Sequence, residues 1–432
     1  MTSEMVTAFV AALQAAGSVL LTIWYGLLAG QFGFLDSHTA KRMSQLGVSM
    51  LLPALLITNL GSQLHLDTVT LYVPILIWSL AYNLVSIAIG LIATRIFRFP
   101  NWVTPALAFN NTTSLPLLLV QSLASTGALS QVLKSPDDTV SEALSRAESY
   151  LLVSSIVGNS LTFGLGGDLL GAHDEDPRDE FEKMLRDGSS DASNLEEGEN
   201  PEEQPDEETS LLPRSVVNYQ SRVSRSAYSA ASHVWDEYLP HPVQTVVARV
   251  ARFMSPPIWG AAIGVLLGLA PPLHRAFFSD PQDGGIFKAW LTSSVKNLGQ
   301  LFVAQQVVVV GAKLAHGLGK MKRGEAAGEL PPLAVLFILF VRFVFWPVVS
   351  IAVIVLTANK TSLLGDDPIL WFTMMMMPTG PPAMKLTALA EAMHANEEEK
   401  LAITKFLSIS YAVSPIITPT IMMSLKACRE WI

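Results

Sequence analysis

Charged residues are scarce in this sequence, where they make up 15% of the 432 residues. Soluble domains carry about 25% charged residues, so the composition excludes an ordinary soluble protein. Cysteine is almost absent, and the single Cys428 rules out a disulfide within the chain. Half of the residues are hydrophobic, and apolar runs of membrane-spanning length recur along the chain. The sequence therefore predicts an all-α polytopic membrane protein.

Ten transmembrane helices are expected, in two sets of five. The first five spans are predicted at residues 6–30, 40–63, 69–97, 102–128 and 150–170. The second five are predicted at residues 257–273, 289–314, 332–357, 369–393 and 401–425. The first residues lack the basic region of a cleaved signal peptide, so we expect the first apolar run to be retained as a span.

Several kinds of reactive site are also missing from the sequence. Carboxylates are absent from the middle of spans one to four and six to eight, whereas a sodium/proton antiporter of inverted-repeat design needs them. We find no phosphate-binding loop, no metal-ligand cluster and no pair of nucleophile and base. The sequence therefore predicts neither an enzyme nor an ATP-driven pump, and no cofactor or metal.

The acidity of the chain belongs to one segment. Residues 173–215 hold about 16 Asp and Glu against about 4 Lys and Arg, a balance near −12 within a total of −9. This stretch has too little apolar surface to offset its ordering entropy, so we expect a largely disordered loop. The predicted domains are a first repeat at 1–172, this acidic loop at 173–247 and a second repeat at 248–432.

An odd number of spans in each half forces the second half to cross the membrane in the opposite sense. This is the pattern of an inverted-topology repeat. Lys and Arg are enriched in the connections on the side of the long loop, including Lys41, Arg42, Arg95 and Arg98. The positive-inside rule places that side in the cytosol, and both termini on the luminal or extracellular side.

The fourth span of each half is interrupted by polar residues or proline. Span four contains the stretch 110–116, and span nine contains the stretch 377–382. Proline removes a backbone donor, and the freed carbonyls need a protein-enclosed cavity. Broken helices in matching places of two halves indicate a transporter's binding site. One such span alone could equally be a proline-kinked helix with its hydroxyls bonded to the preceding turn.

If the two breaks cross, their helix ends and polar side chains form one pocket at the membrane midplane. The positive N-terminal end of a half-helix suits a carboxylate. Lys385 follows the second break, and Asn59 and Gln305 hold equivalent places in spans two and seven. The candidate substrate-binding residues are Asn110, Asn111, Thr112, Thr113, Ser114, Pro116, Asn59, Gln305, Pro378, Thr379, Gly380, Pro381, Pro382 and Lys385.

The motif Asn110-Asn-Thr-Thr-Ser-Leu-Pro116 resembles the Asn-x-x-x-Leu-Pro crossover of the auxin efflux carrier family. Leu51-Leu-Pro53 resembles that family's second helix, and the five-loop-five plan covers the whole chain. The chain is similar to PIN-LIKES and fungal members. The resemblance implies that helices four and nine cross at their breaks, with Asn110 and Asn111 near the substrate carboxylate. Span nine departs from the family pattern because it has no Asn at its break.

The resemblance implies a secondary transporter or facilitator of small organic anions, such as auxin-like weak acids, that works by elevator-like alternating access. We expect movement driven by the substrate gradient or the membrane potential. The alternatives are a sodium-coupled organic anion symporter and a non-transporting membrane adaptor that acts through its acidic loop.

The expected partners are the organic anion, the lipid bilayer and a second copy of the chain in a homodimer, with no nucleic acid. The loop, whose stretch 207–214 resembles an acidic di-leucine sorting signal, would bind sorting or regulatory proteins. The expected location is the endoplasmic reticulum, with the vacuolar or endosomal membrane as the alternative.

Overall fold

The computed structural model describes residues 3–64, 69–171, 254–323, 330–383, 385–392 and 397–430, and residues 240, 243, 244 and 247 between them. The regular secondary structure of this described part is helical, apart from one isolated β-bridge. Five of its helices are long and apolar enough to cross a membrane. The number of candidate spans rises to seven if each of two bent helix pairs counts as one span. Nearly all of the predicted acidic loop lies outside the described residues.

The first half follows the predicted spans closely. It contains α1 (Ser3–Gln31), α2 (Ser37–Leu46), the π-helical turn η1 (Gly47–Leu51), α3 (Leu52–Gln63) and α4 (Val69–Phe97). The interrupted span consists of α5 (Val103–Ala108) and α6 (Ser114–Ser125), and α7 (Val140–Leu170) follows.

The beginning of α7 was predicted ten residues too late, at residue 150. The helix begins at Val140 because Thr139 and Glu142 form a capping box. The Thr139 hydroxyl accepts the Glu142 N–H, and the Glu142 carboxylate accepts the Thr139 N–H. The early start brings Arg146 and Glu148 into the helix.

The second half contains more bends than predicted. Its helices are α11 (Pro256–Leu269), α12 (Pro271–Phe278), α13 (Ser293–Lys322), α14 (Pro332–Phe340), α15 (Trp346–Lys360), α16 (Pro368–Met376), α17 (Lys385–Ala392), α18 (Glu397–Ala412) and α19 (Thr418–Glu430). The chain turns by 102° between α11 and α12, where Pro271 opens the new helix, so the predicted end of span six at residue 273 was wrong. A second bend, of 51°, divides the predicted span ten near Pro415.

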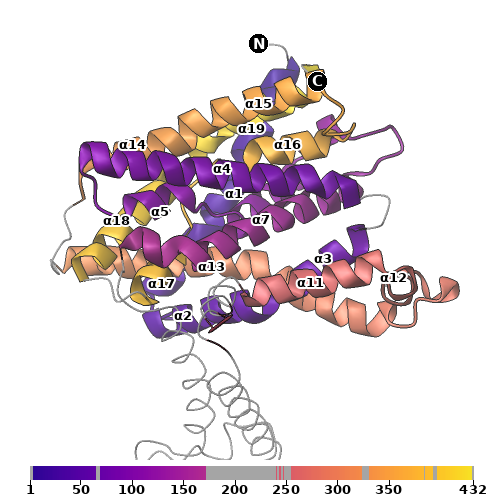
Figure 1. The fold of residues 1–432 in the computed structure, drawn as a ribbon, viewed down its shortest axis with the longest axis horizontal. Coiled ribbons are helices and arrows are strands. Elements are labelled where there is room, and N and C mark those ends of the chain that lie inside the picture. The colour runs from indigo at the N-terminus through magenta and orange to yellow at the C-terminus, as the bar shows by residue number, and fades with distance from the viewer. Residues whose placement is uncertain are drawn as a thin grey trace, which may run out of the picture. The chain divides into compact units, whose positions relative to one another are not determined.

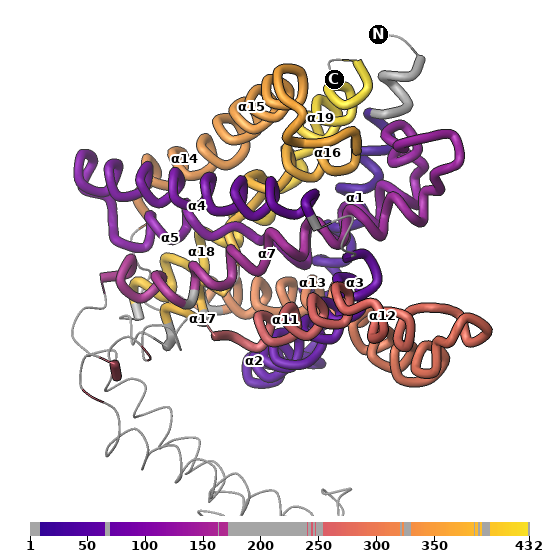
Figure 2. The backbone as a smooth tube through the Cα atoms, turned by 45° about the vertical axis from the view of Figure 1, so that its right-hand side comes forward, coloured from indigo at the N-terminus to yellow at the C-terminus, as the bar shows by residue number. Residues whose placement is uncertain are grey.

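Two helix pairs pack backbone to backbone. In the pair α1 and α13, a Cβ on Gly26 would lie 2.0 Å from the carbonyl oxygen of Val308. In the pair α3 and α11, a Cβ on Gly260 would lie 2.5 Å from the Cα of Pro53. Small residues allow such close approach between membrane helices, and no larger residue fits at either place. We call these four helices the scaffold group; α13 also packs against α3, which joins the two pairs, and α3, α11 and α13 lie close together in Figures 1 and 2.

A second set of helices, α4, α7, α15 and α16, is joined by polar contacts around the second break; we call it the carrier group. The Trp346 indole of α15 donates to Ser86 of α4 at 3.0 Å. The Tyr150 hydroxyl of α7 donates to Asp367, the N-cap of α16, at 2.8 Å. The start of α1 and the end of α19 lie at the same end of the helical body (Figures 1 and 2).

Candidate functional site

The two interrupted spans cross each other, and their backbones bond where they meet. The Asn111 N–H donates to the Pro381 carbonyl at 3.0 Å, and the Ala383 N–H donates to the Phe109 carbonyl at 2.9 Å. These two bonds form an antiparallel bridge between Asn110 and Pro382. Because a bilayer interior offers no water to unpaired backbone groups, such a bridge would allow both helices to end inside a membrane.

The carbonyl end of α16 is covered by hydrogen-bond donors from several elements. Five successive carbonyl oxygens, from Met374 to Pro378, each accept a bond from outside the ordinary helical ladder. The donors are Trp78 to Met374 at 2.9 Å, Ser350 to Met375 at 2.8 Å, Thr379 to Met376 at 2.7 Å, Asn110 to Met377 at 2.5 Å and Arg342 to Pro378 at 3.1 Å. The negative end of this half-helix is therefore satisfied by protein groups alone.

Asn110 and Asn111 have different partners although they are adjacent. The Asn110 side chain is 2% exposed and lies on the second break, where its amide donates to the Met377 carbonyl. The Asn111 amide donates instead to the Tyr411 hydroxyl at 3.0 Å and to the Ser114 hydroxyl at 3.1 Å. Asn110 thus joins the two breaks, whereas Asn111 is held by hydroxyl groups beside a pocket.

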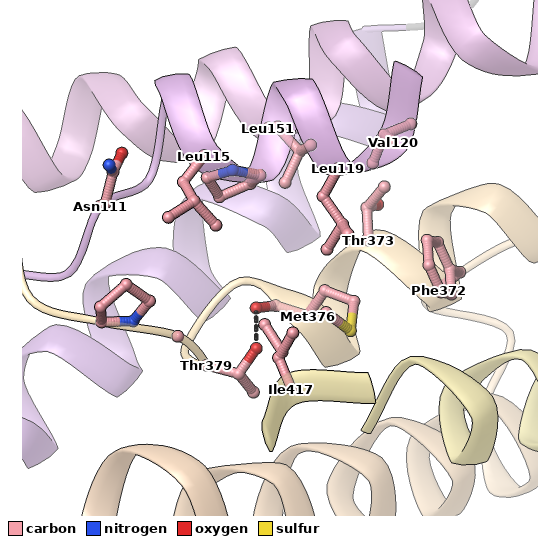
Figure 3. A pocket seen from close by; sticks show the side chains of 13 residues that line it. Asn111, Leu115, Leu119, Val120, Leu151, Phe372, Thr373, Met376, Thr379 and Ile417 are labelled. Carbon is pink, nitrogen blue, oxygen red and sulfur yellow. Dashed lines mark hydrogen bonds between the residues drawn. The ribbon is translucent and has the colours of Figure 1, made fainter. Parts of the chain in front are cut away.

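This pocket lies between α6, α7, α16 and the second break, and it leaves a cavity of about 20 Å³, room for about one water molecule (Figure 3). Its polar side chains are those of Asn111, Thr373 and Thr379. The rest of its lining is apolar and comes from Leu115, Pro116, Leu119, Val120, Leu151, Phe372, Met376, Gly380, Pro381 and Ile417. A mostly apolar pocket with a few fixed polar groups is typical of a small-molecule site.

The pocket also contains the beginning of a helix. α6 starts at Ser114, with Thr113 as a cap that makes no side-chain bond to the helix. Its first N–H groups have no carbonyl of a preceding helical turn, so this end carries a positive partial charge. Leu115 and Pro116 of the same first turn line the pocket. An anionic group is therefore favoured over a cationic one at this end.

Arg342 provides a full positive charge close to the crossing. It lies in the π-helical turn η5 (Val341–Phe345), and its side chain is 0% exposed. One guanidinium nitrogen donates to the Pro378 carbonyl, while Nε and Nη2 have no partner among the described residues. Its burial in an apolar helix makes it a strong functional candidate, but it was not among the predicted site residues.

The sequence profile of the membrane transport protein family matches residues 12–422. The chain belongs to this family. The resemblance to auxin efflux carriers, drawn from the residues around the crossing, is thereby confirmed, and with it a role in membrane transport.

Individual relatives in this family agree with that assignment. An uncharacterized transporter of Schizosaccharomyces pombe is 26% identical over 413 residues, which cover 90% of this chain and 88% of the relative. An uncharacterized transporter of Saccharomyces cerevisiae is 23% identical, covering 94% and 92% of the two chains. Protein PIN-LIKES 5 of Arabidopsis thaliana is 28% identical over 148 residues, 34% of each chain.

Five of the residues proposed from the sequence line the pocket of this transporter, namely Asn111, Pro116, Thr379, Gly380 and Pro381. Asn110 and Pro382 form the bridge beside it, and Pro378 accepts from Arg342. Ser114 bonds Asn111, and Thr113 caps α6. Thr112 is buried, and its hydroxyl has no partner among the described residues.

Three further candidates are bonded elsewhere. Lys385, the first residue of α17, donates to Asn159 of α7. Gln305 donates to the Met43 carbonyl at 2.9 Å, and Asn59 donates to Glu148 at 3.1 Å. None of these three lines the pocket at the crossing.

Sequence reasoning did not find the pocket residues that lie outside the two breaks. Phe372 and Thr373 precede the second break within α16, and their apolar or hydroxyl side chains gave no signal. Tyr411 lies 300 residues from its partner Asn111, a pairing that no local pattern contains. Among the described residues, no group of three or more His, Cys, Asp or Glu side chains could hold a metal ion.

Proposed function

We propose that this chain is a secondary transporter of small organic anions and that it binds its substrate at the crossing of the two interrupted helices. The observation that carries this proposal is the position of Asn111, a buried amide between the first turn of α6 and the second break. A carboxylate would accept from the first N–H groups of α6 and, in place of the Tyr411 or Ser114 hydroxyl, from the Asn111 amide. The transport role itself rests on the family.

The pocket lining supports an anion with an apolar body. Side chains of α6 and α16 provide an apolar surface around a few polar groups. Once the pocket has widened around a ligand, a carboxylate at Asn111 would leave an aromatic or aliphatic body against Leu119 and Phe372. An auxin-like weak acid such as indole-3-acetate has this combination of groups, and it is therefore the probe we choose.

The helix pairing supports an inverted repeat of ten spans, with α5–α6 and α16–α17 each counted as one broken span. On that count, the pair α1 and α13 joins spans one and seven, and the pair α3 and α11 joins spans two and six. When the two halves are exchanged, spans one and seven take the places of spans six and two, so one pair is superposed on the other. The bridge between the breaks of spans four and nine is superposed on itself by the same exchange. An arrangement of this kind is expected when two inverted repeats share one binding site.

An elevator-like movement is supported by the division into two helix groups. The scaffold group packs through close backbone contacts, which favour a fixed unit. The carrier group is held together by side-chain bonds around α16, so it can move as one body together with α6, which lines the pocket from the other side. We propose that the carrier group slides along the scaffold group and exposes the pocket to each side in turn.

The test is uptake of radiolabelled indole-3-acetate into proteoliposomes that contain the purified protein. Saturable uptake above protein-free liposomes is the expected result, with a higher half-saturation concentration in Asn111→Ala and an unchanged one in the exposed Asn297→Ala. The absence of saturable uptake by the unaltered protein would contradict the proposal for this class of anion. Uptake that requires sodium would favour the sodium-coupled alternative. Function that depends on the loop at 173–247 but not on the crossing would favour the adaptor.

A further inference from the structure

Glu148 is a half-buried carboxylate that the proposed anion site does not use. It lies on α7, one turn before the pocket residue Leu151. One of its oxygens accepts from the Gln121 amide of α6 at 2.8 Å, and the other accepts from the Asn59 amide of α3 at 3.1 Å. Three helices therefore meet at a single ionisable group.

The two amide partners belong to different parts of the proposed transporter. Gln121 follows the pocket residue Val120 on the broken span, whereas Asn59 lies on α3 of the scaffold group. Ser145 of α7 extends this connection, because its hydroxyl accepts from Gln63 of α3 at 3.0 Å. The hydrogen bonds of Glu148 and Ser145 thus cross the interface between α7 and α3, along which α7 would slide.

The charges around Glu148 come from few groups. Lys296 of α13 acts on it by Coulombic attraction. On α7 itself, Arg146 is bonded to Asp138 and Asp367, and Glu142 belongs to the capping box. The groups that contact Glu148 from α3 and α6 are uncharged amides.

We propose that Glu148 is a proton-binding site that couples a proton to the movement of the carrier group, which departs from the expectation that the substrate gradient or the membrane potential alone drives this movement. The proposal rests on the proposed function in one respect, since it assumes that α7 slides along α3. In the proton-free state, both carboxylate oxygens accept amide hydrogens and join α7 to α3. Proton binding forms one O–H bond on the carboxylate and removes its negative charge. The protonated oxygen then accepts an amide hydrogen only weakly, so one of the two hydrogen bonds is lost or weakened.

The physical reason is the cost of moving a charge. A carboxylate that leaves its amide partners inside a membrane protein would lose hydrogen bonds that no water replaces. The neutral acid can make the same movement without an unpaired charge. Glu148 would therefore take up a proton before the carrier group moves and release it when the bond to Asn59 forms again.

The first test measures the proton directly, without any transport. Infrared difference spectra of the protein in liposomes between pH 8 and pH 5 would show the carbonyl band of a newly protonated carboxyl group. We expect Glu148→Gln to lose this band and Asp168→Asn, an exposed carboxylate on the same helix, to keep it. A band of equal size in Glu148→Gln would overturn the proposal.

The second test measures coupling. An imposed pH gradient, corrected with protein-free liposomes, should stimulate uptake of radiolabelled indole-3-acetate by the unaltered protein and by Asp168→Asn, but not by Glu148→Gln. Equal stimulation of Glu148→Gln would overturn the coupling. Failure of the proposed function would look different, because the unaltered protein would then show no saturable uptake at any pH while the infrared band remained measurable.

Discussion

The side-chain amide of Asn110 donates a hydrogen bond to the carbonyl oxygen of Met377 at 2.5 Å, across 267 positions of the chain. This bond gives a donor to a buried carbonyl that the second break would otherwise leave unpaired. The neighbouring Asn111 lines the pocket instead. Asn110 therefore supports the crossing, whereas Asn111 is the residue that we propose binds the anion.

The first prediction concerns Asn110. We expect Asn110→Ala to lower the thermal unfolding midpoint, because an unsatisfied buried carbonyl costs about 1–3 kcal/mol. We also expect it to abolish uptake of indole-3-acetate while the protein is still expressed. Fluorescence-detected unfolding and proteoliposome uptake measure the two effects. An unfolding midpoint and an uptake rate equal to those of the unaltered protein would show that the bond to Met377 does not support the crossing.

The second prediction concerns Asn111. Removal of its amide should weaken anion binding by about 10- to 100-fold, which corresponds to losing a hydrogen bond to a charged group. The effect should appear as a higher half-saturation concentration in uptake, with an unfolding midpoint close to that of the unaltered protein. Asn297→Ala, an exposed residue on α13, is the control. An unchanged half-saturation concentration would remove Asn111 from the binding site.

The third prediction tests the packing of the scaffold group. Gly26→Val adds a side chain where the Val308 backbone already lies, so we expect a loss of about 1–3 kcal/mol and a lower unfolding midpoint. Gly17→Val on the same helix is the matched control, because a Cβ at Gly17 meets nothing within 4 Å. Equal midpoints for the two variants would contradict the close contact between α1 and α13.

The fourth prediction is a pH effect at Asp138, which lies in the connection before α7. The hydrogen bond from Arg146 lowers the pKa of this carboxyl group below its usual value of 3.8. The bond therefore stabilises the folded state at pH values above 3.8, and this stabilisation is lost as the pH falls through the lowered pKa. We expect Asp138→Asn to reduce the unfolding midpoint at pH 7 by the same amount as at pH 5.

A difference between the two proteins that already shrinks between pH 7 and pH 5 would contradict this assignment. Glu142→Gln provides a comparison from the same region, because Glu142 takes part in the capping box rather than in the ion pair with Arg146.

The two broken helices could be predicted from the sequence because their cause is local. Proline and clustered amides cannot continue a helix at membrane depth, and both interruptions were found at the residues predicted. The beginning of α7 was missed because hydropathy does not detect polar helical turns, although the capping box of Thr139 and Glu142 was present in the sequence. The bend near Pro415 was missed because the residues around it are apolar enough to be part of a straight span.

The pocket itself could be predicted only in part. The sequence predicted that Asn111 and Thr379 would share a site, because both lie at breaks. The sequence could not separate the role of Asn110 from that of Asn111. The difference depends on the direction in which each side chain leaves the bridge, and no local pattern gives that direction. The contacts of Tyr411 and Arg342 depend on tertiary packing between distant helices. Glu148 was overlooked because the predicted span began two residues after it.

Binding of the anion where the two breaks cross is the proposal on which the others depend. The most direct measurement is an experimental structure of the protein in lipid with indole-3-acetate bound. We expect ligand density between the first turn of α6 and the second break, with the carboxylate within hydrogen-bonding distance of Asn111. Ligand density elsewhere, with the pocket beside Asn111 and Thr379 empty at saturating ligand, would contradict it.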